Sequence, residues 1–132
     1  SGTSIAVSES NPSRKVIGAE PLQADDAYRS LQSGEIQPSD NPQTIADGLL
    51  TSLGELTFAI IQDRCSGIVT VSEASIVKAM RLVWERMKVV IEPSAAVPVA
   101  ALLEKRNEVP GDRIGVIISG GNVDLERLPW MK

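Results

Sequence analysis

Three short apolar runs, set apart by longer stretches of mixed polarity, predict that strands and helices alternate along this chain. The runs are Arg14–Glu20, Gly67–Ser72 and Arg113–Ile118. Each contains β-branched side chains, which is typical of strands in a buried sheet. Strands that alternate with helices pair in parallel through right-handed crossovers. We therefore predict an α/β fold, a three-layer arrangement in which helices flank a parallel sheet that contains all three runs.

The longest predicted helix covers residues 73–90, with Ser72 as its N-cap and Pro93 as the residue that ends it. Its apolar residues recur at i, i+4 and i+7 and form one stripe, which we expect to face the core. They are Ile76, Val77, Met80, Val83, Trp84, Met87 and Val90. Shorter helices are predicted before Pro12, from the Asp25–Asp26 cap to about Gly34, over 56–64 and over 94–105.

The last apolar run stops abruptly at the polar, glycine-rich segment 119–122, which reads Ser-Gly-Gly-Asn. Consecutive glycines allow backbone conformations and close approaches that other residues resist. Ligands of open α/β sheets bind beyond the carboxyl ends of the strands, so this segment is a candidate binding edge. From these residues alone, a simple tight turn explains the segment equally well.

Composition narrows the class of protein. The chain has 132 residues, of which 42% are hydrophobic, and this suits one globular domain with its own core. A formal charge of −4 argues against nucleic-acid binding, which needs a basic face. The only cysteine, Cys65, cannot form an internal disulfide, which is consistent with a reducing compartment such as the cytoplasm.

Two absences from the sequence also exclude classes of function. No apolar run approaches the roughly 20 residues of a membrane span, and no signal peptide is visible, so we expect no membrane partner. Histidine is absent, which removes histidine-based acid–base catalysis and most zinc sites.

Five segments, in their order and spacing, carry a family resemblance. They are AEPLQADDAYRS at 19–30, TIADG at 44–48, VWERMK at 83–88, IEPSAA at 91–96 and SGGNVDL at 119–125. In these segments the chain resembles the serine racemase and serine/threonine dehydratase family, pyridoxal 5'-phosphate (PLP) enzymes of fold type II. The resemblance implies that residues 1–132 are a single domain, the C-terminal portion of the large PLP-binding domain. It also implies that the N-terminal half, with its phosphate-binding glycine loop, is absent.

The resemblance implies cofactor contacts at Ser119, Gly120, Glu92 and Gly48. Ser119 matches the serine whose hydroxyl meets the pyridine nitrogen of PLP. A neutral hydroxyl does not hold that nitrogen protonated, so the ring is a weaker electron sink than one beside an aspartate. Glu92 matches a glutamate near the ring, and Gly48 lies in a turn that passes close to it. As alternatives, Ser119 is an ordinary turn residue and Glu92 caps the helix that follows.

A divalent-cation site is implied at the carboxylates of Glu20 and Asp26 and the backbone carbonyl of Ala24. Hard oxygen ligands suit Mg²⁺, Mn²⁺ or Ca²⁺. One carboxylate ends a predicted strand and the other opens a helix six residues later, so both can reach one ion. The alternative is that Asp25 and Asp26 are ordinary helix caps and Glu20 is a surface charge.

Two departures from the family pattern affect regulation and catalysis. Lys88 and Asn122 match positions that contact a nucleotide activator, ATP, but Leu56 stands where that site has an asparagine, which puts the effector in doubt. The lysine that holds PLP as a Schiff base lies in a Ser-Phe-Lys motif of the family. None of the five lysines here (Lys15, Lys78, Lys88, Lys105 and Lys132) has that context, so we expect no catalytic residue in this chain.

Two hypotheses from different classes follow. In the first, the chain is part of a homodimeric PLP-dependent serine racemase or L-serine (threonine) dehydratase. Such an enzyme abstracts the α-proton of a small hydroxy-amino acid, followed by racemisation or β-elimination, and needs the missing N-terminal half. In the second, the chain is a non-catalytic excised or engineered half-domain that folds alone and binds a divalent metal.

Overall fold

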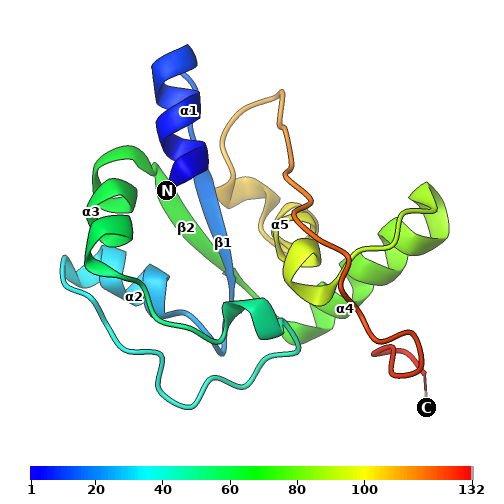
Figure 1. The fold of residues 1–132 in the computed structure, drawn as a ribbon. Coiled ribbons are helices and arrows are strands. Elements are labelled where there is room, and N and C mark those ends of the chain that lie inside the picture. The colour runs from blue at the N-terminus through cyan, green and yellow to red at the C-terminus, as the bar shows by residue number, and fades with distance from the viewer. Residues whose placement is uncertain (132) are drawn as a thin grey trace.

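The computed structural model describes residues 1–131 and contains a parallel sheet between two groups of helices (Figure 1). The strands are β1 (Ile17–Pro21) and β2 (Gly67–Val71). The helices are α1 (Gly2–Ser10), α2 (Asp26–Ser33), α3 (Glu55–Arg64), α4 (Glu73–Leu82) and α5 (Pro93–Glu104). Shorter helical turns are η1 (Asp47–Leu49), the π-helical η2 (Val83–Met87) and η3 (Arg106–Glu108). None of the helices formed by residues 1–131 has the length and apolar character of a membrane span.

The two strands confirm the predicted parallel pairing. Ile17 of β1 pairs with Gly67 of β2, and the register continues to Pro21 and Val71. The helix α2 packs on β2 from one side, while α5 packs on both strands from the other and carries α4 on its outer face (Figure 1). This arrangement has the three layers that the alternation of strands and helices predicted, and it sends the carboxyl ends of both strands to one edge.

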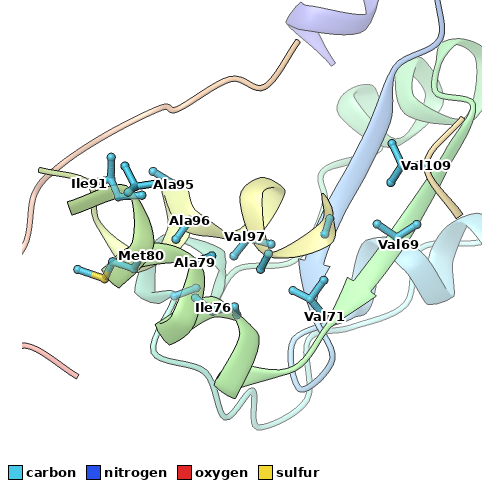
Figure 2. Packing of buried hydrophobic residues seen from close by; sticks show 14 of the residues in the cluster. Val69, Val71, Ile76, Ala79, Met80, Ile91, Ala95, Ala96, Val97 and Val109 are labelled. Carbon is cyan, nitrogen blue, oxygen red and sulfur yellow. The ribbon is translucent and has the colours of Figure 1, made fainter. Parts of the chain in front are cut away.

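Most of the core lies between β2, α4 and α5 (Figure 2). The stripe on α4 is confirmed at Ile76 and Met80, which are fully buried. The facing side of α5 consists of small residues, and Ala95, Ala96 and Ala100 are also fully buried. Small side chains allow the two helices to approach closely, so larger residues there would cost about 1–3 kcal/mol through overpacking.

The helix predicted for residues 73–90 ends earlier than expected. After α4 the chain widens into η2, and Lys88 then adopts a left-handed conformation with φ 58°. Met87 and Val90, predicted to face the core, are instead 59% and 53% exposed. Pro93 is the first residue of α5, where its fixed φ and missing N–H are tolerated, so it begins a helix rather than ending one.

The prediction of a third strand at Arg113–Ile118 is wrong. The segment belongs to no strand, and Ile117 is 59% exposed. A strand needs a neighbour that satisfies its N–H and C=O groups, but residues 113–118 form no backbone hydrogen bond within the described chain. Figure 1 shows the segment running past α5 at a distance from β2 and toward the C-terminus.

Two helix ends that the sequence marked are confirmed, whereas Asp25 stands at the N-cap of α2 without a side-chain capping hydrogen bond. Gly34 ends α2 in the left-handed conformation, with φ 78°. The Ser72 hydroxyl accepts a hydrogen bond from the Ser75 N–H and caps α4.

The C-terminal residues fold back on the turn after η2. The rings of Trp84 and Trp130 meet there edge to face, with their centroids 5.4 Å apart. The Trp84 ring N–H also donates to the Ile91 carbonyl oxygen at 2.9 Å. Trp84 thus fixes the start of α5 from the side of η2.

Candidate functional site

The glycine-rich segment 119–122 lies against the residues that begin α5. The backbone N–H of Glu92 donates to the Gly120 carbonyl oxygen at 3.1 Å. The carboxylate of Glu92 accepts, through Oε2, a hydrogen bond from the Asn122 N–H at 3.0 Å. The structure therefore brings together Glu92 and Gly120, two of the residues predicted to contact the cofactor.

The two glycines are needed for close approach and not for an unusual backbone conformation. Neither Gly120 nor Gly121 is among the residues with positive φ. A Cβ on Gly120 would lie 2.6 Å from Oε1 of Glu92, and one on Gly121 would lie 2.7 Å from the Val90 carbonyl oxygen. Both distances are too short for a Cβ atom. A side chain on Gly121 would push the segment away from the Val90 backbone, and one on Gly120 would displace the Glu92 carboxylate.

Gly48 approaches the same helix end from another loop. Its N–H donates to the Ser94 hydroxyl at 3.1 Å and to the Asp47 carboxylate at 2.9 Å. A Cβ on Gly48 would lie 2.9 Å from the Ser94 hydroxyl oxygen. Sequence reasoning did not single out Ser94, although it lies inside the 91–96 segment. The start of α5 thus binds both glycine turns that were predicted to lie near the ring. Glu92, its N-cap, binds Gly120, and Ser94, in its first turn, binds Gly48.

Ser119 presents a hydroxyl at the surface of this segment. The residue is exposed, and its hydroxyl forms no hydrogen bond with the rest of residues 1–131. A free neutral hydroxyl on a glycine-rich turn can donate to, or accept from, a ring nitrogen without transferring charge to it. The residues present therefore fit one edge of a pyridine-type cofactor.

Lys88 and Asn122, predicted to contact a nucleotide, lie at the end of η2 and after the glycine-rich segment. Both residues are exposed, and no hydrogen bond links them within the described chain. Lys88 ends η2, and the backbone of Asn122 is bound to Glu92. Leu56 lies in the first turn of α3, is 77% exposed and offers no polar group.

Glu20 and Asp26 form a second candidate site, on the other side of the sheet from α5. Glu20 lies near the end of β1, and Asp26 is the first residue of α2. The Glu20 carboxylate accepts a hydrogen bond from the Tyr28 N–H at 2.8 Å. No N–H or O–H of residues 1–131 donates to the carbonyl oxygen of Ala24, a residue that is only 4% exposed. A buried carbonyl oxygen without a donor is suited to bind a cation.

Burial raises the pKa of Glu20 to about 7, and the negative charges of Asp26 and Asp25 add to this while the Tyr28 N–H opposes it. Burial likewise raises the pKa of Asp26. No lysine or arginine of the described chain forms a salt bridge with Glu20 or Asp26. Two carboxylates that resist ionisation, beside an unused carbonyl oxygen, fit a hard divalent cation, because the cation would supply the missing positive charge.

The ligand set of such an ion would be small. Across residues 1–131 there is no group of three or more His, Cys, Asp or Glu side chains that could hold a metal ion. The protein ligands would therefore be the carboxylates of Glu20 and Asp26 and the carbonyl of Ala24. Mg²⁺ keeps several waters in sites of this kind.

No hydrogen bond links Ser119 to a lysine within residues 1–131. Lys105 follows α5 at the end opposite Glu92 and binds Glu108 at 3.1 Å. Lys15 precedes β1, and Lys78 lies on the exposed face of α4. Lys132 lies outside the described residues.

Comparisons with known proteins agree on one family. A profile described as "Pyridoxal-phosphate dependent enzyme" matches residues 1–120. The chain is 54% identical to a serine racemase of Dictyostelium discoideum over 97% of its own length. It is 50% identical to a beta-hydroxyaspartate dehydratase of Paracoccus denitrificans (strain Pd 1222) over 98%. The structure is similar to a solved threonine deaminase of T.th., with a TM-score of 0.89, 45% identity and 94% of this chain covered.

The match covers only part of each of these proteins. The chain spans 41% of the length of both curated relatives and 46% of the threonine deaminase chain. The structures of residues 1–131 and of the deaminase thus agree over one portion of a longer enzyme. The profile match extends from the first residue through both strands and α5 to Ser119 and Gly120.

Proposed function

The chain belongs to the pyridoxal-phosphate dependent enzyme family, and from this premise we propose that it is the C-terminal part of the cofactor-binding domain of a serine racemase or dehydratase. The substrates would be small hydroxy-amino acids. Relatives named serine racemase and beta-hydroxyaspartate dehydratase, at 54% and 50% identity, support this class of substrate. The proposal concerns the complete enzyme, because the chain spans 41% of those relatives.

The free Ser119 hydroxyl, on a turn fixed against α5, is the observation that carries the proposal. When bound, PLP would supply an electron sink for the pair left by the departing α-proton. Ser119 would place a neutral hydroxyl at the ring nitrogen. Glu92 and Gly120 would form the wall beside it, and the Gly48 turn would approach from the neighbouring loop. A neutral partner makes the ring a weaker sink, which suits a short-lived carbanion and its quick reprotonation or loss of a β-hydroxyl.

A second part of the enzyme would complete this site. The apolar residues Ile114, Ile117 and Ile118 are exposed although they precede the binding edge. Their backbone groups have no hydrogen-bond partner in the described chain, so a strand from elsewhere would satisfy them. We assign the Schiff-base lysine, which would take the α-proton, and the phosphate-binding loop to that part.

Glu20, Asp26 and the Ala24 carbonyl would hold Mg²⁺, or Mn²⁺ or Ca²⁺ in its place. The raised pKa of both carboxylates and the unused carbonyl oxygen support this. The ion would tie the end of β1 to the start of α2. Its role would be structural, since the segment after Ser119 is bonded to Glu92 at the start of α5, and α5 covers the other face of the sheet from α2.

The assembled enzyme would be a cytoplasmic homodimer. The single cysteine, Cys65, supports a reducing compartment, and exposed apolar side chains support burial against another protein surface. We do not extend the proposal to ATP, because Leu56 replaces the expected asparagine. The family match favours part of an enzyme over the alternative of a stand-alone, non-catalytic half-domain.

The test uses the full-length protein that carries this chain, supplied with PLP. D-serine and pyruvate formed from L-serine are measured for the parent, Ser119→Ala and the control Ser66→Ala. Ser66 is an exposed serine before β2, at the opposite end of the strands. We expect turnover by the parent and by Ser66→Ala, and a roughly tenfold lower kcat for Ser119→Ala, as expected for one lost hydrogen bond. A parent that binds no PLP, or equal activity of all three proteins, would refute the proposal.

A further inference from the structure

We infer that Glu92 is a positioning residue that fixes the Ser119 hydroxyl by holding the three residues after it against α5. The inference rests on the proposed function, because it assigns a role to Glu92 within the site proposed for the cofactor ring around Ser119. It differs from a cofactor contact, since the Glu92 carboxylate acts here on the protein backbone.

Glu92 binds the segment through two hydrogen bonds, one in which it donates and one in which it accepts. Its N–H donates to the Gly120 carbonyl oxygen at 3.1 Å, and its Oε2 accepts from the Asn122 N–H at 3.0 Å. Gly121, between these two points, lies against the Val90 carbonyl oxygen. One residue therefore fixes both the position and the direction of the backbone that leaves Ser119.

The fit leaves little freedom to the carboxylate. Oε1 of Glu92 lies 2.6 Å from the place where a Cβ of Gly120 would be, so the carboxylate fills the space that the glycine leaves. A glutamine keeps the length of the side chain and one oxygen acceptor. An aspartate is one methylene shorter and cannot reach the Asn122 N–H from the same backbone position.

These contacts matter because, within residues 1–131, no hydrogen bond holds Ser119 from its N-terminal side. Residues 113–118 form no backbone hydrogen bond within the described chain, and Ile117 and Ile118 are exposed. Moving along the chain from Arg113, the Glu92 contacts are the first hydrogen bonds that attach it to the rest of the fold. Beyond them, Val123 packs against the core.

The same helix offers a matched control at its other end. Glu104 also binds a backbone N–H through its carboxylate, with Oε2 at 3.1 Å from the Ser72 nitrogen. That contact joins the end of β2 to α5 and is not part of the edge around Ser119. The Glu104→Ala variant therefore shows how α5 responds when a hydrogen bond between a glutamate side chain and a backbone N–H is removed away from Ser119.

The experiment compares the full-length holoenzyme with its Glu92→Ala, Glu92→Gln and Glu104→Ala variants. Hydrogen exchange is followed by mass spectrometry in peptides that cover residues 118–124. The absorption and emission spectra of bound PLP and the kinetics with L-serine are recorded in parallel. Glu92→Asp is included as well, because it keeps the negative charge but shortens the side chain by one methylene.

For Glu92→Ala we expect roughly tenfold faster exchange at residues 119–123, since a hydrogen bond to a carboxylate is lost. The cofactor spectrum should shift and kcat should fall by a similar factor, with KM changed less. Glu92→Gln should restore most of each property and Glu92→Asp little. Glu104→Ala should leave the exchange of this segment and the cofactor spectrum unchanged.

Unchanged exchange in Glu92→Ala would overturn the inference, and so would equal effects of Glu104→Ala on the Ser119 segment. Faster exchange with an unchanged cofactor spectrum would overturn it as well, because the segment would then not position the ring contact. Failure of the proposed function has a different signature, since the parent itself would bind no PLP. In that case the exchange data alone would decide whether Glu92 holds the segment.

Discussion

Gly121 lies so close to the backbone of Val90 that a Cβ atom on the glycine would be 2.7 Å from the Val90 carbonyl oxygen. The contact joins two stretches that are 31 residues apart in the sequence. It involves main-chain atoms on one side, which cannot rotate away as a side chain can. The position of the segment 119–122 therefore depends on the absence of a side chain at Gly121.

Gly121→Ala should lower the free energy of unfolding by about 1–3 kcal/mol, because the added methyl overpacks a contact with fixed backbone. Urea denaturation of the parent and variant measures the difference. Gly115→Ala is the control, since a Cβ there meets nothing within 4 Å. Its stability should stay within about 0.5 kcal/mol of the parent. Equal stability of the two variants would show that the Gly121 approach is not constrained.

Glu20 should make stability fall as pH rises in metal-free buffer. Its pKa in the folded chain is raised to about 7 from 4.5, mainly by burial, so the folded state binds the proton more tightly than the unfolded state. The sign follows directly, because the state that binds more protons is favoured at low pH. The contribution is fully present below about pH 4.5 and is lost by about pH 7, with a total on the order of 1–3 kcal/mol.

The variant that isolates this effect is Glu20→Gln, whose amide resembles the protonated acid. Urea unfolding in EDTA at several pH values between 4.5 and 8 compares the two proteins. The difference in unfolding free energy between variant and parent should grow in favour of the variant as pH rises. A constant difference over this range would contradict the raised pKa of Glu20.

Mg²⁺ should bind the parent chain and bind Glu20→Ala and Asp26→Ala at least roughly tenfold more weakly. Each substitution removes one of the two carboxylates, and hard cations depend on the number and charge of their oxygen ligands. Isothermal titration calorimetry at pH 8 measures the affinities. Glu35→Ala removes an equal charge from an exposed loop residue and should bind as the parent does. Identical affinities for all four proteins would refute the cation site.

The 132-residue chain alone, mixed with PLP, should show no turnover of L-serine. Ser119 and the turn after it would contact a single ring edge, and an open site leaves most of a ligand in water, so the cofactor should bind weakly. Pyruvate and D-serine assays, with the full-length protein as positive control, check this. Robust turnover by the chain alone would mean that one of its own lysines performs the chemistry assigned to the missing part.

The sequence determined the elements whose signals are local. The apolar runs before Pro21 and before Ser72 are β1 and β2, and Gly34 and Ser72 end and begin helices as predicted. Caps and apolar periodicity depend on residues within a few positions of each other, so one chain segment contains the whole signal. The family resemblance likewise indicated Glu92 and Gly120 together.

Only the tertiary structure decided the features that depend on distant neighbours. The apolar run 113–118 has the composition of a strand, yet no described strand pairs with it, because strand formation requires hydrogen bonds from another segment. The π-helical turn η2 takes Met87 out of the apolar stripe and leaves it exposed, which the i, i+4 spacing could not show. The hydrogen bond from the Asn122 N–H to the Glu92 carboxylate joins residues that are 30 positions apart in the sequence. It forms because the fold brings the start of α5 next to the segment 120–122. The hydrophobic pattern within either segment does not indicate that the two are close in space.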